Sequence, residues 1–81
     1  MRLRVKLFAL LKDKAGAAEV ELELPQGARA GDVLAQLGRA HPELAAHLPH
    51  CRLALNHEFA SPEEPVLEGA EAAVIPPVSG G

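Results

Sequence analysis

Two short segments near the start of the chain alternate apolar and charged residues. The apolar side chains fall at every second position in Arg2–Leu7 and again in Glu19–Leu24, which is the pattern of strands with one buried face. The outward positions are basic in the first segment and acidic in the second. One antiparallel register brings opposite charges together outside and apolar residues together inside; its predicted pairs are Arg2–Glu23, Leu3–Leu22, Arg4–Glu21, Val5–Val20 and Lys6–Glu19. A slip of one residue buries the charges, so the pattern predicts this register.

The spacing of apolar residues changes to that of a helix from about Ala30. The predicted buried stripe of this helix consists of Val33, Leu34, Leu37 and Ala40. Asp32 lies in the first turn, where a negative charge interacts favourably with the helix dipole. We expect the helix to end near His41, because Pro42 disfavours helical geometry in the residue before it.

Three further strands are expected in the second half of the chain. Apolar residues alternate again in Cys51–Leu55, and Asn56-His57 is a plausible tight turn into a short strand at Glu58–Ala60. The run Ala72–Ile75 is apolar throughout, which is typical of a central strand buried on both faces. The element order predicts an α+β fold of the β-grasp type, a mixed sheet of four to five strands with one main helix packed across it. Residues 1–75 would form this domain and residues 76–81 a flexible tail.

Composition narrows the class of function. The chain has 81 residues, a formal net charge of −3, two phenylalanines as its aromatic residues and one cysteine. A domain of this size has little room for an enclosed catalytic cavity, so an enzyme acting on its own is not expected. The basic stripes and aromatic platforms of nucleic-acid binders are missing. We find no signal peptide, membrane span or disulfide framework, which favours the reducing cytoplasm.

The chain ends in Pro76-Pro77-Val78-Ser79-Gly80-Gly81 directly after the last expected strand. Prolines cannot extend a strand ladder, and glycines have no side chain to hold them against the domain. We therefore expect this tail to project by roughly 20 Å at about 3.3 Å per residue, enough to enter the narrow active site of another protein. The alternative interpretation is a frayed end.

The chain resembles the ubiquitin-like sulfur carrier family (MoaD/ThiS-like), and within it the small subunits of molybdopterin synthase. Phe8-Ala9, Leu55-Asn56, Leu67-Glu68-Gly69 and the closing Pro-Pro-Val-Ser-Gly-Gly carry the resemblance, which covers the full length. The chain departs from the family pattern at Ala70, where many members have Asp, and at Arg29, where a helix-capping Thr is common. Both departures affect a turn or a cap and neither affects the tail.

The resemblance implies a role for Gly81. A carboxylate is a poor electrophile at neutral pH, and in the family an E1-like adenylyltransferase (MoeB-like) activates the terminal glycine with ATP. A sulfurtransferase or cysteine desulfurase then supplies sulfur to form a thiocarboxylate. The tail enters the large synthase subunit (MoaE-like), where the sulfur attacks a cyclic pyranopterin phosphate on the way to molybdopterin. No cofactor bound to the chain itself is implied.

The resemblance also implies a docking patch, with Phe8, Phe59 and Ile75 in matching positions. Phe59 is expected on the surface, whereas Phe8 is equally compatible with the core. A zinc site built from His47, His50 and Cys51 is disfavoured because no second cluster completes it. Cys51 is expected to face inward as a packing residue. Three alternatives stay open: a carrier for thiamine or tRNA thiolation, a ubiquitin-like protein modifier, and an interaction module whose tail has no role.

Overall fold

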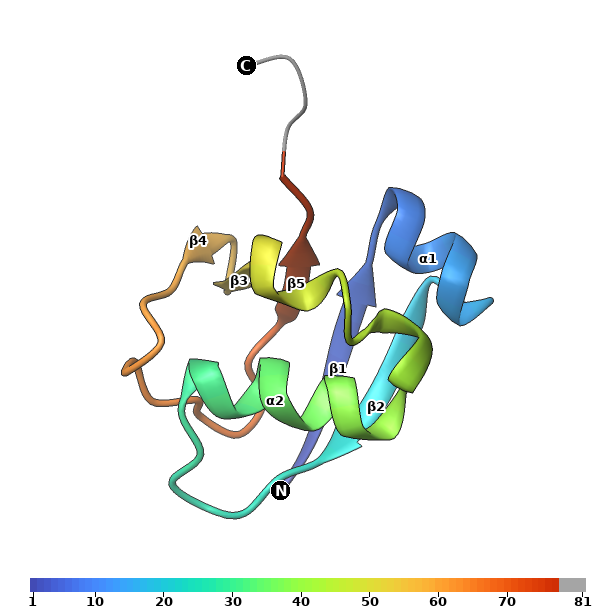
Figure 1. Cartoon of the computed structure of the whole chain (residues 1–81). Helices are drawn as coiled ribbons and strands as arrows, with labels where there is room; N and C mark the ends of the chain where they lie inside the picture. Colours follow the sequence, from blue (N-terminus) through green and yellow to red (C-terminus); the bar gives the residue numbers. More distant parts are fainter. Residues whose placement is uncertain (78–81) are drawn as a thin grey trace.

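The computed structural model describes residues 1–77. The chain forms strands β1 (Arg2–Leu7) and β2 (Glu19–Glu23), with helix α1 (Ala9–Ala15) between them. Helix α2 (Ala30–Ala40) follows, and two 3-10 turns, η1 (Pro42–Leu44) and η2 (Leu48–His50), lead to β3 (Arg52–Leu55), β4 (Glu58–Phe59) and β5 (Ala72–Ile75). Figure 1 shows α2 crossing one face of the sheet, and the N-terminus at the opposite end of the molecule from the end of β5.

The five strands form one mixed sheet in the order β2-β1-β5-β3-β4. The parallel pair β1 and β5 lies at its centre, and the other neighbouring strands are antiparallel. The core lies between the sheet and α2 and is made of aliphatic side chains, among them Leu3, Val5, Leu22, Val33, Leu37, Leu44, Leu53 and Val74. The predicted β-grasp fold is confirmed.

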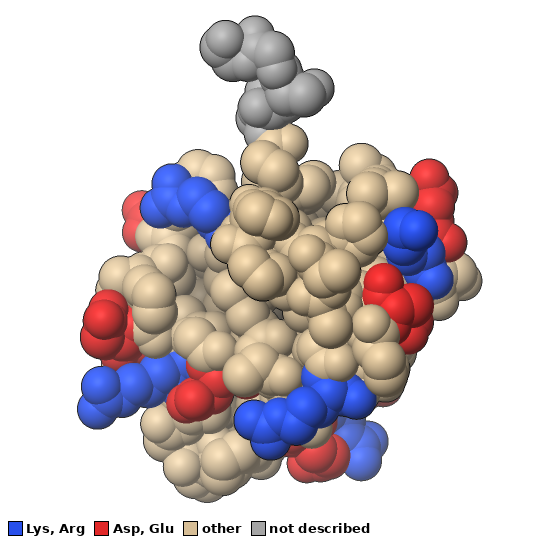
Figure 2. Space-filling view, viewed as in Figure 1, with Lys and Arg blue, Asp and Glu red and all other residues tan. Residues whose placement is uncertain are grey.

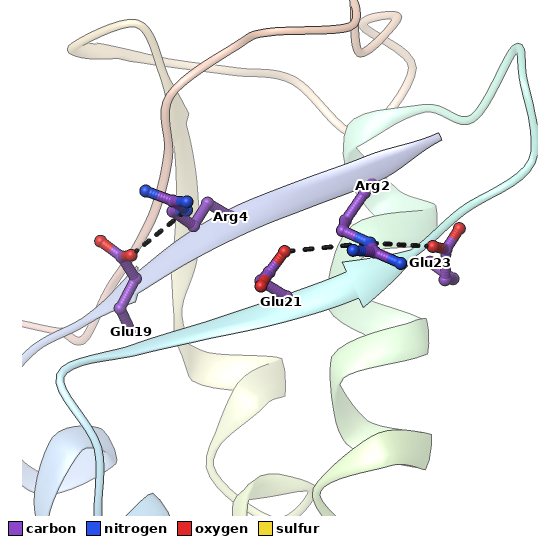
Figure 3. A network of polar contacts seen from close by, with 5 residues as sticks. All are labelled: Arg2, Arg4, Glu19, Glu21 and Glu23. Carbon is purple, nitrogen blue, oxygen red and sulfur yellow. Dashed lines mark hydrogen bonds and ion pairs between the residues drawn. The ribbon is translucent and has the colours of Figure 1, made fainter.

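The predicted pairing of the first two strands is also confirmed. All five pairs, from Arg2–Glu23 to Lys6–Glu19, are present in the β1–β2 ladder. The ion pairs follow this register only in part, as Figure 3 shows: Arg2 lies 3.1 Å from Glu23 and 3.9 Å from Glu21, while Arg4 lies 3.5 Å from Glu19. Long side chains on twisted strands reach diagonal neighbours, so Arg4 contacts Glu19 rather than the directly opposite Glu21.

Helix α2 has the predicted position and the predicted stop before Pro42. Arg29 occupies the N-cap position, and its backbone N–H donates a 2.8 Å hydrogen bond to Oδ2 of Asp32. Asp32 therefore binds an otherwise unpaired backbone donor at the helix start. The predicted inclusion of Ala40 in the buried stripe is wrong, because Ala40 is exposed at the end of the helix and Ala30 is buried in its place.

Three further expectations need correction. Helix α1 was not predicted from the sequence. It contributes one buried side chain, that of Leu11, to the core. Strand β4 ends at Phe59, one residue earlier than expected. Strand β5 is central but buried on one face alone, with Ala72 and Val74 in the core and Ala73 and Ile75 half-buried. The reason is that α2 covers one face of the sheet and leaves the other open.

Candidate functional site: the open face of the sheet

An open cavity of about 370 Å³ lies on the sheet face opposite α2. Its floor consists of small residues, Ala54 of β3 and Ala73 of β5, which are neighbours in the β3–β5 ladder. Larger side chains surround this floor: Lys6, Phe8, His57, Phe59, Glu71 and Ile75. On the face that carries α2, charged side chains lie around the margin and few lie at the centre (Figure 2).

The three predicted docking residues, Phe8, Phe59 and Ile75, all line this cavity. Phe59 is 54% exposed, so its predicted surface position is confirmed, and Phe8 is 44% exposed, which decides between the two interpretations left open for it. Ile75 is half-buried. Large exposed apolar side chains gathered around one hollow are typical of a protein-binding surface. Their role in docking stays a prediction.

The turn at Asn56 and His57 holds one rim of the cavity. Both residues have positive φ, 51° and 71°, as a two-residue turn between antiparallel strands requires. The backbone N–H of Asn56 donates to the carbonyl of Glu71 at 2.8 Å, and the side-chain oxygen of Asn56 accepts from the backbone N–H of Glu71 at 3.0 Å. His57 Nε2 lies 3.3 Å from a carboxylate oxygen of Glu71. The β3–β4 turn is thereby fixed to the segment that enters β5.

The tail begins next to this cavity. Pro76 directly follows Ile75 at the end of the central strand and is half-buried, and Pro77 is exposed. The remaining predicted tail residues, Val78, Ser79, Gly80 and Gly81, lie outside the described residues. The described part of the tail therefore begins at the end of the sheet where Phe8 and Ile75 lie.

Cys51 is placed as a packing residue. It is half-buried against the core, its Sγ donates to the carbonyl oxygen of His47 at 3.2 Å, and burial raises the pKa of the thiol. A thiol with a raised pKa is a weak nucleophile at neutral pH. Within residues 1–77 no group of three or more His, Cys, Asp or Glu side chains is placed to hold a metal ion.

The cavity floor and part of its rim were not identified from the sequence. Ala54 and Ala73 stand at the outward positions of their strands, opposite in parity to Leu53 and Val74. That alternation is the signal that could have identified them.

No helix in the described part of the chain is long and apolar enough to span a membrane.

A mixed sheet crossed by one helix, with an apolar cavity on its open face beside the end of the central strand, defines a ubiquitin-like protein. The chain belongs to the ThiS family, whose model matches residues 5–81. It is 42% identical over 83 residues to the molybdopterin synthase sulfur carrier subunit of Chlamydomonas reinhardtii, with all of both chains covered.

Two solved structures extend the comparison. The crystal structure of SAMP1 from Haloferax volcanii has a TM-score of 0.89 and 35% identity, with all of both chains covered. A protein-protein complex of subunits 1 and 2 of molybdopterin-converting factor from Helicobacter pylori contains a chain with a TM-score of 0.70 and 22% identity, again with all of both chains covered. At that identity the second similarity supports the fold.

Proposed function

We propose that this protein is the sulfur carrier subunit of molybdopterin synthase. It is a carrier and not an enzyme on its own. The observation that carries the proposal is the apolar cavity beside the end of β5, in a chain whose family match extends to Gly81. A partner that binds the cavity receives the tail at the same time. The full-length similarity to a protein named as a sulfur carrier subunit supports this function.

The proposed chemistry takes place at the carboxylate of Gly81. Because this group is an anion at neutral pH and a poor electrophile, it needs activation. In the proposed sequence an E1-like adenylyltransferase transfers AMP from ATP to the carboxylate, and pyrophosphate leaves. A persulfide sulfur of the donor protein then displaces AMP, which gives an acyl disulfide. A second thiol attacks the S–S bond of this intermediate, so that the thiocarboxylate leaves and a disulfide remains on the donor. This sulfur is an anionic nucleophile at pH 7, by analogy with a thiolate.

The proposed acceptor is a cyclic pyranopterin phosphate held by the large synthase subunit. Phe8, Phe59 and Ile75 would contact that subunit, and Pro76–Gly81 would enter its active site. The adenylyltransferase and a sulfurtransferase or cysteine desulfurase are the other proposed partners. The carrier itself supplies no catalytic acid or base and no cofactor in this scheme, and its proposed location is the cytoplasm.

A second candidate function is protein modification. The similarity to small archaeal modifier protein 1 of Haloferax volcanii, which is 37% identical to this chain over 84 residues, favours it. Conjugation and sulfur transfer both begin with the adenylate at Gly81 and diverge at the attacking group. A lysine amine gives an isopeptide, whereas a persulfide gives the thiocarboxylate.

Deletion of Gly81 tests the proposal. The shortened protein should keep its melting temperature, because the described core contains no residue after Val74, and should fail to restore molybdoenzyme activity in a cell that lacks its own carrier. Leu67→Ala is the matched control, since Leu67 is 71% exposed and does not line the cavity. Restoration of activity by the shortened protein would overturn the proposal.

A further inference from the structure

Arg52 is stacked on the ring of Phe59. Its guanidinium carbon lies 4.1 Å from the ring centroid. Arg52 is the first residue of β3 and pairs with Ile75 at the end of β5, while Phe59 pairs with Ala54 of the same strand. A guanidinium over an aromatic face is attracted by the ring and loses freedom of movement. Arg52 is therefore a positioned cation at the edge of the open face, level with the point where the tail begins.

The other arginines on this face are in a different situation. Arg2 lies within ion-pair distance of Glu21 and Glu23 of β2, and Arg4 lies within ion-pair distance of Glu19. Arg52, in contrast, forms no ion pair with any carboxylate of residues 1–77. The N–H groups of its guanidinium also donate no hydrogen bond to residues 1–77. These donors match the two oxygens of a carboxylate.

The other charges around the cavity lie farther from the end of β5. Lys6 is level with Ala73, two residues before Ile75, and Glu71 precedes the strand and faces His57. Arg52, next to Ile75, thus places a basic residue at the end of the open face where the tail begins, and Glu71 places an acidic residue at the opposite end. A partner with the complementary arrangement presents an acidic residue next to the entrance that receives the tail.

We propose that Arg52 binds an aspartate or glutamate of the partner that receives the tail, beside the apolar side chain that enters the cavity. This inference rests on the proposed function, because it takes the large synthase subunit as that partner. Arg52 acts as a specificity residue for docking. Since Phe59 already restricts its side chain, less conformational entropy is lost on binding than with a free arginine.

Binding of the large synthase subunit to the full-length carrier tests the assignment, measured by calorimetry at low and at high NaCl concentration. Arg52→Gln should weaken binding by about tenfold at low salt, and the loss of affinity with added salt should become smaller. Arg4→Gln is the matched control, because Arg4 is an exposed arginine of the same face; its affinity should stay within about twofold of wild type.

Two more variants separate the charge from support of the Phe59 ring. Arg52→Lys keeps the charge and Arg52→Met keeps an apolar stem against the ring. Tighter binding by the Lys variant than by the Met variant supports the assignment. The reverse order, or an Arg52→Gln variant that binds like wild type, overturns it and leaves the proposed function standing. A wild-type carrier that fails to bind the large subunit overturns the proposed function, and this assignment with it.

Discussion

Phe59 pairs with Ala54 across the short β3–β4 ladder, so the more exposed of the two aromatic rings stands beside a methyl group. A large side chain next to a small one leaves a hollow, and here the hollow continues across Ala73 to Phe8 on the far side. Phe59 is held at this rim by a two-residue strand and by the stacked Arg52. Its exposure and position together make it the strongest candidate for an energetic centre of docking.

Phe59→Ala should therefore separate binding from folding. We expect a small change in melting temperature, because the ring is 54% exposed, and a loss of about 2 kcal/mol or more in binding to the large synthase subunit. Leu67→Ala, which removes an exposed apolar side chain outside the cavity, should change neither quantity. Unchanged binding by Phe59→Ala would remove this residue from the docking surface.

The charged ladder between β1 and β2 should contribute little to function. Arg4→Glu replaces an ion pair with Glu19 by repulsion from Glu19 and from Glu21 opposite. The side chains are solvated, so the free energy of unfolding should fall by about 1 kcal/mol or less. Denaturant titration and a sulfur-transfer assay on the same variant test this. Lost transfer at unchanged stability would mean that this part of the sheet also contacts a partner.

The first two strands could be predicted because two independent signals agree on one register. The apolar alternation fixes which side faces the core, and the opposite charges of Arg2–Lys6 and Glu19–Glu23 fix which residues are neighbours. Helix α1 gave no comparable signal. It has seven residues and no side-chain cap, and it starts at Ala9, whose φ of 50° is unusual for a residue with a side chain.

The candidate site could be predicted in its large residues and not in its shape. Phe8, Phe59 and Ile75 were assigned to a docking patch because they match positions of the family that the chain resembles. The cavity depends on the strand order β1-β5-β3, which brings Ala73 next to Ala54. The contact between Arg52 and Phe59 depends in addition on the hairpin geometry. Ala54 and Ala73 are far apart in the chain and meet through the tertiary structure, which local sequence patterns do not encode.

The β3–β4 turn should tolerate and favour glycine. His57 has φ of 71°, which is costly for a residue with a Cβ atom and free for glycine. We expect His57→Gly to raise the free energy of unfolding by about 0.5–1 kcal/mol, since the exposed pair with Glu71 contributes little. Glu71→Gln is the control that removes the carboxylate facing His57 and keeps the turn. A less stable His57→Gly protein would contradict this account of the turn.

Cys51 should react slowly with alkylating reagents at neutral pH. Burial raises the pKa of its thiol, so the thiolate fraction in the folded protein is smaller than in the unfolded chain. The contribution of this thiol to the free energy of unfolding is fully present at a pH below its pKa in the unfolded chain. The contribution is lost as the pH rises through its pKa in the folded protein. The rate of iodoacetamide labelling can be measured against pH with and without denaturant. In the folded protein the rate should begin to rise at a higher pH than in the unfolded chain. Equal profiles would show that the thiol is fully solvated.

The intact mass of the protein isolated from cells tests the central claim most directly. A sulfur carrier should contain a fraction whose mass exceeds that of the unmodified chain by the replacement of one oxygen with sulfur, and this fraction should disappear when Gly81 is deleted. Fragmentation should place the change on the terminal residue. A population that carries no sulfur, and appears instead as conjugates joined through Gly81 to lysines of other proteins, would contradict the carrier function and support the modifier.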